Sequence, residues 1–167
     1  MKIVIVGAGA VGTHLSKLLS REHQDCVLID ADEEQLEGVS EYDVMTYNAL
    51  PTSISVLKDA GADKADLFVG VTTEETTNIA ACTIAHALGA KKTVARIDNY
   101  EYLKPQNQKF FQQIGIDSMV YPEVLAATDI TNGLKMSWVR QRWDVHGGAL
   151  VLLGIKLRQG CEILDQA

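Results

Sequence analysis

The feature that most constrains this chain is a set of three glycines directly after its first apolar run. The sequence begins MKIVIVGAGAVGTHLSKLL, so Gly7, Gly9 and Gly12 have the spacing G-x-G-x-x-G. The apolar run is typical of a buried strand, and the residues after the glycines have helical spacing. This context predicts a strand, a tight turn and a helix whose free N-terminal N–H groups face a phosphate.

Each glycine has its own expected role in such a turn. Gly7 allows the tight turn, Gly9 lets a pyrophosphate approach the main chain, and Gly12 lets the helix pack closely on the strand. Asp30 ends the next apolar run, where a carboxylate can accept hydrogen bonds from both hydroxyls of an adenosine ribose. An acid there also repels a 2′-phosphate, which favours NAD or an adenine nucleotide over NADP. The alternative interpretation is a structural turn with a helix cap at Asp30.

Apolar runs and helical patterns alternate along most of the chain. Strands are expected at 2–6, 26–30, 43–47, 66–71, 92–97 and 117–121, with the longest helix from about Glu75 to Leu88 and a further helix from Glu123 to Lys135. Right-handed crossovers between such strands give a doubly wound parallel sheet. We therefore predict an α/β, Rossmann-like fold with a six-stranded sheet in the order 3-2-1-4-5-6, flanked by helices.

The pattern changes after residue 136. We expect residues 1–136 to form a nucleotide-binding domain and residues 137–167 to hold a crossover segment followed by one strand at 149–160. No partner strand for 149–160 is evident in the sequence. Either a second copy of the chain supplies the partner, or the chain ends inside a second domain.

Composition narrows the class of protein. The net charge of −7 disfavours nucleic acid as a partner, since phosphate binding depends on clusters of Lys and Arg. No apolar run approaches the roughly 20 residues of a membrane span, so we do not expect the chain to cross a bilayer. Its three cysteines have no C-x-x-C spacing, which is typical of free thiols in a reducing compartment. These features favour a cytoplasmic protein.

Polar residues follow the other predicted strands at their carboxyl ends, where ligands of open α/β sheets bind. Asn48 and Ala49 follow the third strand and are expected to border an adenine. Thr72 and Thr73 follow the fourth strand, where they can reach a ribose or a phosphate.

Arg96 is a charged residue in the apolar fifth strand. Burying its charge without a partner would be costly, so a partner is expected. A bound polyphosphate is one candidate, and an internal salt bridge with Glu75 or Glu123 is the other.

Residues for catalysis are harder to find. Hydride transfer needs a proton donor such as His, Lys or Tyr near the nicotinamide. Tyr100 and Lys104 have the Y-x-x-x-K spacing of one dehydrogenase class, but Pro105 follows them and the glycine spacing differs, so we consider the match incidental. We predict no catalytic residue and no metal ligand, and a small NAD-dependent oxidoreductase is the alternative to a binding role.

Three stretches resemble the KTN family, also called RCK N-terminal or TrkA-N, of nucleotide-binding regulatory domains. They are VIVGAGAVGTHLSKLL with VLIDADEEQLE, the TTEETTN stretch that ends at Asn78, and ARIDNYEYL. The resemblance covers about residues 1–135. It implies a cytoplasmic module at the inner face of the plasma membrane that binds NAD(H), or alternatively ATP or ADP. It further implies homodimers or rings that gate a potassium-translocating membrane subunit of Trk or Ktr type without consuming the nucleotide.

The resemblance also implies a set of binding residues. The expected phosphate loop is Gly7, Ala8, Gly9, Ala10 and Val11, next to Gly12; the other expected contacts are Asp30, Ala31, Asn48, Ala49, Thr72, Thr73, Glu75, Asn78, Arg96 and Glu123. Tyr47 stands where the family commonly has glycine, so we expect an altered adenine end of the site. The tail from residue 149 resembles the first strand of the family's C-terminal domain (RCK-C or TrkA-C), cut short.

Overall fold

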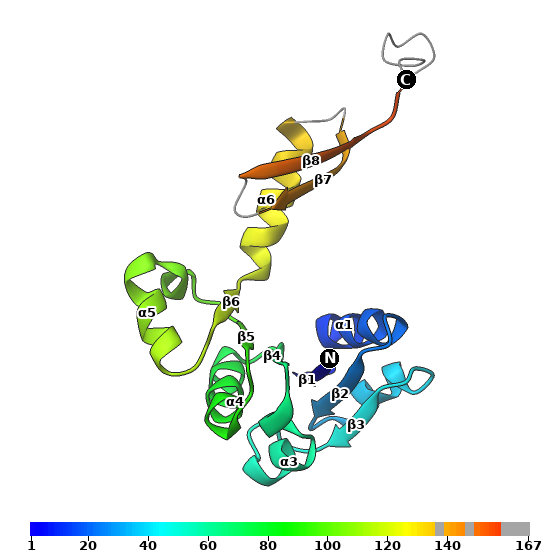
Figure 1. The fold of residues 1–167 in the computed structure, drawn as a ribbon, viewed down its shortest axis with the longest axis vertical. Coiled ribbons are helices and arrows are strands. Elements are labelled where there is room, and N and C mark those ends of the chain that lie inside the picture. Colours follow the sequence, from blue (N-terminus) through cyan, green and yellow to red (C-terminus); the bar gives the residue numbers. More distant parts are fainter. Residues whose placement is uncertain (136–138, 146–148, 158–167) are drawn as a thin grey trace. The chain divides into compact units, whose positions relative to one another are not determined.

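The computed structural model of the chain describes residues 1–135, 139–145 and 149–157 (Figure 1). The chain divides into two compact units, Met1–Pro122 and Glu123–Ala167. Within the described ranges, no helix has both the length and the apolar character needed to cross a membrane.

The described part of the first unit contains a six-stranded sheet in which all neighbouring strands are parallel. Its strands are β1 (Lys2–Val6), β2 (Asp25–Asp30), β3 (Met45–Asn48), β4 (Leu67–Gly70), β5 (Thr93–Arg96) and β6 (Ser118–Val120). Their order is β3-β2-β1-β4-β5-β6, which confirms the predicted doubly wound sheet. The strand order reverses between β1 and β4, and such a switch point is where open α/β sheets bind ligands.

Helices and short 3-10 turns connect these strands. They are α1 (Ala10–Arg21), α2 (Glu33–Leu36), η1 (Glu37–Val39), α3 (Ile54–Asp59), η2 (Ala62–Lys64), α4 (Glu75–Leu88), η3 (Tyr100–Leu103) and α5 (Pro105–Gln113). Local signals explain their ends: the Asp32 carboxylate accepts a hydrogen bond from the N–H of Glu34 at 3.0 Å and caps α2. Gly89, with φ of +124°, ends α4 where a side chain would be strained.

The central strands are buried on both faces. In β1, Ile3 and Ile5 pack on the side of α1 and α2, whereas Val4 and Val6 pack on the side of α3, α4 and α5. A strand covered on both faces must be apolar throughout, and for this reason KIVIV shows no polar alternation.

The second unit contains a helix and a hairpin. The predicted helix at 123–135 is confirmed as α6 (Pro122–Lys135). The strand expected at 149–160 is present as β8 (Leu150–Ile155), but the expectation that it has no partner is wrong. It pairs antiparallel with β7 (Val139–Val145), with Trp143 opposite Leu152.

The strand β7 escaped detection although its sequence, VRQRWDV, alternates charged residues with mostly apolar ones, because it lacks the continuous apolar run that marks the inner strands of the parallel sheet. His146, Cys161 and Trp138 lie outside the described residues. The assignment of 137–167 to a crossover and the start of a second domain stays a prediction.

Candidate functional site

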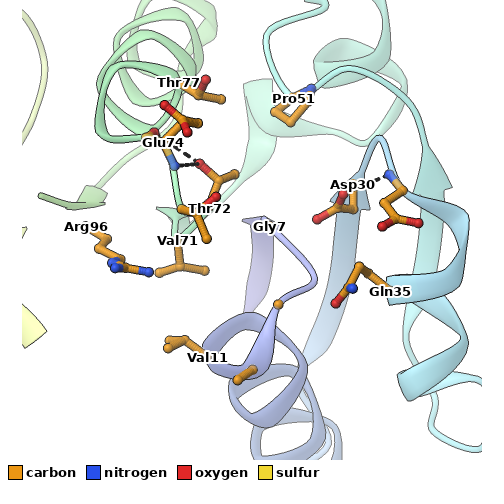
Figure 2. Close-up of a pocket in the computed structure, with 14 residues that line it drawn as sticks. Gly7, Val11, Asp30, Gln35, Pro51, Val71, Thr72, Glu74, Thr77 and Arg96 are labelled. Atoms are coloured by element: carbon orange, nitrogen blue, oxygen red, sulfur yellow. Dashed lines mark hydrogen bonds between the residues drawn. The ribbon is translucent and has the colours of Figure 1, made fainter. Parts of the chain in front are cut away.

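A cavity of about 570 Å³ lies at the carboxyl ends of the central strands of the first unit (Figure 2). Five segments supply its lining: the glycine loop with the start of α1, the end of β2 with α2, the loop after β3, the loop after β4 with the start of α4, and the end of β5. The lining residues are Gly7, Gly9, Ala10, Val11, Asp30, Asp32, Gln35, Pro51, Val71, Thr72, Thr73, Glu74, Thr77 and Arg96.

The three glycines of the loop have different surroundings. Gly7 has φ of +104°, and a Cβ built on it would lie 2.6 Å from the main-chain nitrogen of Thr72. A Cβ on Gly12 would lie 1.8 Å from the carbonyl oxygen of Gly7. A Cβ on Gly9 would meet no atom of the described residues within 4 Å beyond its two chain neighbours. The fold itself therefore requires glycine at positions 7 and 12, whereas Gly9 borders open space in the cavity.

The N-terminus of α1 faces this space. Its first-turn residues Ala10 and Val11 line the cavity directly after Gly9. The first N–H groups of a helix have no acceptor within the helix, and together they carry a partial positive charge. The loop thus offers main-chain donors to an anion.

The Asp30 carboxylate is fixed by the main chain. It accepts hydrogen bonds from the N–H of Ala8 at 2.5 Å and from the N–H of Asp32 at 2.9 Å. The backbone around it is held from β3, since the Asn48 side chain donates to the carbonyls of Asp30 and Ala31 at 3.3 and 3.1 Å. Ala8, Ala31 and Asn48 therefore support Asp30 and do not line the cavity themselves.

Asn78 is fully buried beneath the loop after β4. Its Nδ2 donates to the carbonyls of Thr72 and Arg96, both at 3.0 Å, and its Oδ1 accepts from the N–H of Thr72 at 2.8 Å. The hydroxyl of Thr72 lies 2.8 Å from the same oxygen. With its amide fully engaged, Asn78 joins the ends of β4 and β5 and does not line the cavity.

Arg96 is the only basic side chain among the described residues of the lining. Its Nη2 donates to Oδ1 of Asp98 at 3.2 Å, and about a fifth (22%) of the side chain is exposed. Its Nε is buried and has no hydrogen-bond partner among the described residues. A buried donor without an acceptor is unfavourable, and the Nε can reach an acceptor in the cavity only if the Arg96 side chain moves it out of its buried position.

The internal partner of Arg96 is therefore Asp98, and the suggested pairing with Glu75 is wrong. The Oε2 of Glu75 instead accepts from the N–H groups of Asp98 and Asn99 at 2.6 and 2.7 Å. Glu123 belongs to the second unit, and its part in the site stays a prediction.

Several predicted residues thus line the cavity and others lie behind it. Those in the lining are Gly7, Gly9, Ala10, Val11, Asp30, Thr72, Thr73 and Arg96. Those of the first unit outside it are Ala8, Gly12, Ala31, Asn48, Ala49, Glu75 and Asn78. Ala49 donates its N–H to the Asp30 carbonyl at 2.9 Å and belongs with the residues that support Asp30.

Sequence reasoning missed Asp32, Gln35, Pro51, Val71, Glu74 and Thr77 in the lining. The cap pattern of Asp32 and Gln35 was the available signal, since it puts both residues at the start of α2 beside the end of β2. The expectation for Tyr47 at the adenine end stays a prediction. The hydroxyl of Tyr47 donates to the carbonyl of Asp59 at 3.0 Å, and its ring packs against the core outside the lining.

Known proteins with similar sequences share a domain with this chain. The sequence model of the TrkA-N domain matches residues 3–122. The Trk system potassium uptake protein TrkA of Haemophilus influenzae is 41% identical over 134 residues, which cover 78% of this chain and 29% of that protein. The protein of the same name from Vibrio alginolyticus is 37% identical over 170 residues, which cover 100% of this chain and 37% of that protein. The chain therefore spans about a third of the length of these relatives.

Solved structures share the fold at low sequence identity. The TrkA-N domain of the Escherichia coli inner membrane protein ybaL has a TM-score of 0.68 at 17% identity, over 80% of this chain and 96% of that chain. The GsuK channel bound to NAD has a TM-score of 0.58 at 17% identity, over 71% and 21% of the two chains. GsuK bound to ADP has a TM-score of 0.57 at 16% identity, over 71% and 30%. With its first unit matched almost from end to end by the family's sequence model, this chain belongs to the TrkA-N domain family.

Proposed function

We propose that this chain is the nucleotide-binding part of a regulatory subunit of a potassium uptake system. The relatives named Trk system potassium uptake protein support the role in potassium uptake, and the cavity supports nucleotide binding. The observation that carries the proposal is the pairing of two features in one cavity: open space at Gly9 and Arg96, the only basic side chain among the described residues of the lining. Both features suit an anionic group.

In this proposal the glycine loop and α1 bind phosphate through main-chain N–H groups, at Gly9, Ala10 and Val11. Asp30 accepts hydrogen bonds from a ribose, and Arg96 pairs with a phosphate oxygen. Arg96 and Asp30 lie on opposite sides of the turn at Gly7 in the view of Figure 2. An elongated ligand with a diphosphate in its middle suits this arrangement, which favours NAD(H), with ADP or ATP as alternatives.

The structures of GsuK with NAD and with ADP support a nucleotide in a fold of this kind. They concern a channel that shares only the fold with this chain. Which nucleotide this chain binds therefore rests on its own residues and on the binding experiment below.

The chemistry that we propose is binding and release, without reaction. None of the described residues that line the cavity is a His, Lys or Tyr, which are the usual proton donors of hydride transfer. A ligand regulates a partner if it binds two conformations with different affinity, and a few kcal/mol of difference suffices. We propose that the partner is a potassium-translocating membrane subunit at the inner face of the plasma membrane, contacted by a homodimer or ring of this chain.

Calorimetry with the full chain tests the proposal. We expect at least one of NADH, NAD, ADP and ATP to bind with a dissociation constant below about 1 mM. Asp30→Arg should abolish NADH binding while the circular dichroism spectrum stays native. If none of the four nucleotides binds, the regulatory proposal is wrong. If NADH is oxidised in the presence of small carbonyl substrates, the oxidoreductase alternative takes its place.

A further inference from the structure

We propose that Glu75 and Asn78, in the first turn of α4, are positioning residues that hold Arg96 at the cavity without touching the ligand. The proposal rests on the proposed function, since the position of Arg96 affects binding only if an anionic ligand occupies the cavity. Neither Glu75 nor Asn78 lines the cavity.

Asn78 fixes the backbone of Arg96 itself. Its Nδ2 donates to the Arg96 carbonyl at 3.0 Å and to the Thr72 carbonyl at 3.0 Å, so one buried amide ties together two segments that line the cavity. Its Oδ1 is taken up by Thr72. Because every donor and acceptor of this amide has a protein partner, none is left for a nucleotide.

Glu75 fixes the segment that follows Arg96. Its Oε2 accepts from the N–H of Asp98 at 2.6 Å and from that of Asn99 at 2.7 Å. Asp98 in turn accepts from the Arg96 guanidinium at 3.2 Å. Glu75 therefore acts through Asp98, because it holds the backbone of the residue that orients the Arg96 side chain.

The contacts made by Asn78 and Glu75 restrict the conformational freedom of the Arg96 side chain before a ligand binds. Arginine loses much rotamer freedom when it binds a phosphate in one geometry, and a site in which part of that freedom is already restricted binds more tightly. Asn78 holds the backbone of Arg96, and Glu75 with Asp98 restricts one end of its guanidinium. Among the described residues the buried Nε has no hydrogen-bond partner, and the Arg96 side chain still lines the cavity.

A double-mutant cycle with NADH as the probe tests this proposal in the full chain. The variants are Glu75→Ala, Arg96→Met and the combination of both. Arg96→Met should weaken NADH binding by about tenfold to a hundredfold, the usual range for a hydrogen bond to a charged group. Glu75→Ala should weaken it by about tenfold in the natural background and by less than about twofold beside Arg96→Met, because contacts that act through one residue are not additive.

Glu75→Gln is the matched control. Glutamine removes the charge but keeps an oxygen that accepts from Asp98 and Asn99, so NADH affinity should stay within about twofold of the natural chain. A purely electrostatic role of Glu75 would instead tighten the binding of an anion in both the Ala and the Gln variant, which would overturn the proposal.

Asn78→Ala in the same cycle tests the second residue, with Thr93→Val as the control for stability. Thr93 is also fully buried, and its hydroxyl bonds to the Gly115 carbonyl at 2.6 Å away from the cavity. Asn78→Ala should weaken NADH binding more where Arg96 is present than beside Arg96→Met, because the same amide also holds the Thr72 segment. Thr93→Val should lower the melting temperature without changing affinity.

Equal losses for Glu75→Ala with and without Arg96 would overturn the positioning role, and so would an Arg96→Met variant that binds normally. In both cases nucleotide binding by the natural chain would still stand. Absence of binding by the natural chain would instead remove the proposed function.

Discussion

Replacing Gly12 with alanine should destabilise the first unit, whereas the same change at Gly9 should leave its stability almost unchanged. The new Cβ at position 12 would lie 1.8 Å from the Gly7 carbonyl oxygen, so α1 and the loop must separate by more than about 1 Å to reach an ordinary contact. Gly7 cannot easily retreat, because its N–H donates to the Ile29 carbonyl at 2.9 Å and its other side faces the main chain of Thr72.

The loss of stability expected for Gly12→Ala depends on which atom the new Cβ would contact. Overpacking costs about 1–3 kcal/mol, and a clash with a backbone atom belongs at the upper end because no flexible side chain can move aside. For a chain of this size, about 3 kcal/mol corresponds to a fall in melting temperature of roughly 6–12 °C. At Gly9 no atom lies within 4 Å of the new Cβ, so the free energy of unfolding should change by less than about 1 kcal/mol.

Thermal and urea unfolding followed by circular dichroism measure both variants, and calorimetry with NADH adds the functional comparison. Gly9→Ala should have the same melting temperature as the natural chain but bind NADH at least about tenfold more weakly, since its methyl group fills the space that we assign to phosphate. The reasoning is refuted if Gly12→Ala melts within about 2 °C of the natural chain, or if the two variants lose the same stability.

Three further changes test other parts of the structure. Asp30→Asn should weaken NADH binding by about tenfold or more in calorimetry, because the ribose loses charge-assisted hydrogen bonds; unchanged affinity would remove Asp30 from the site. Glu74→Gln should tighten ATP binding several-fold and AMP binding less, since it removes one negative charge from the lining; equal effects on both would contradict this. Burial raises the pKa of the Cys82 thiol from its ordinary value near 9 to about 12. The unfolded chain therefore ionises first, and stability should fall between pH 9 and 12, by about 2 kcal/mol up to pH 10.5 in urea unfolding and less in Cys82→Ala.

The sheet was predictable because its signals are local and repeated. Each inner strand must be apolar on both faces, and each crossover has a helix with recognisable ends, such as Gly89 after α4. These patterns, with the handedness of crossovers, leave few topologies, and the predicted strand order is confirmed.

The hairpin of the second unit was not predictable in the same way. The VRQRWDV stretch alternates charged and mostly apolar residues as a strand does, but its pairing with β8 depends on which segments meet, and the sequence does not state this. Cross-strand pairs such as Trp143 with Leu152 become visible only when the register is known.

The position of the candidate site was predictable from the sequence, but which residues line the cavity and which support it from behind was not. Sequence patterns identify residues near the ends of β2, β4 and β5, and Asp30, Thr72 and Arg96 do line the cavity. The patterns cannot tell a side chain that faces the cavity from one that faces the backbone behind it. Asn78 illustrates this limit, because its direction is set by the Arg96 carbonyl at the end of β5 and the Thr72 carbonyl in the loop after β4.

Main-chain groups and side chains of the site differ in how well they can distinguish one nucleotide from another. Main-chain N–H groups at the start of α1 suit the phosphates that NAD, ADP and ATP share, so they cannot by themselves distinguish these ligands. The charged side chains of the lining are mainly acidic, with Asp30, Asp32 and Glu74 opposed by Arg96 as the only base among the described residues there. Each additional phosphate charge therefore meets more repulsion, which favours a dinucleotide with two phosphates over a free triphosphate. Because Arg96 is the only basic side chain that opposes this repulsion among the described lining residues, a shift of the β5 segment that carries it should change the affinity for each nucleotide by a different factor.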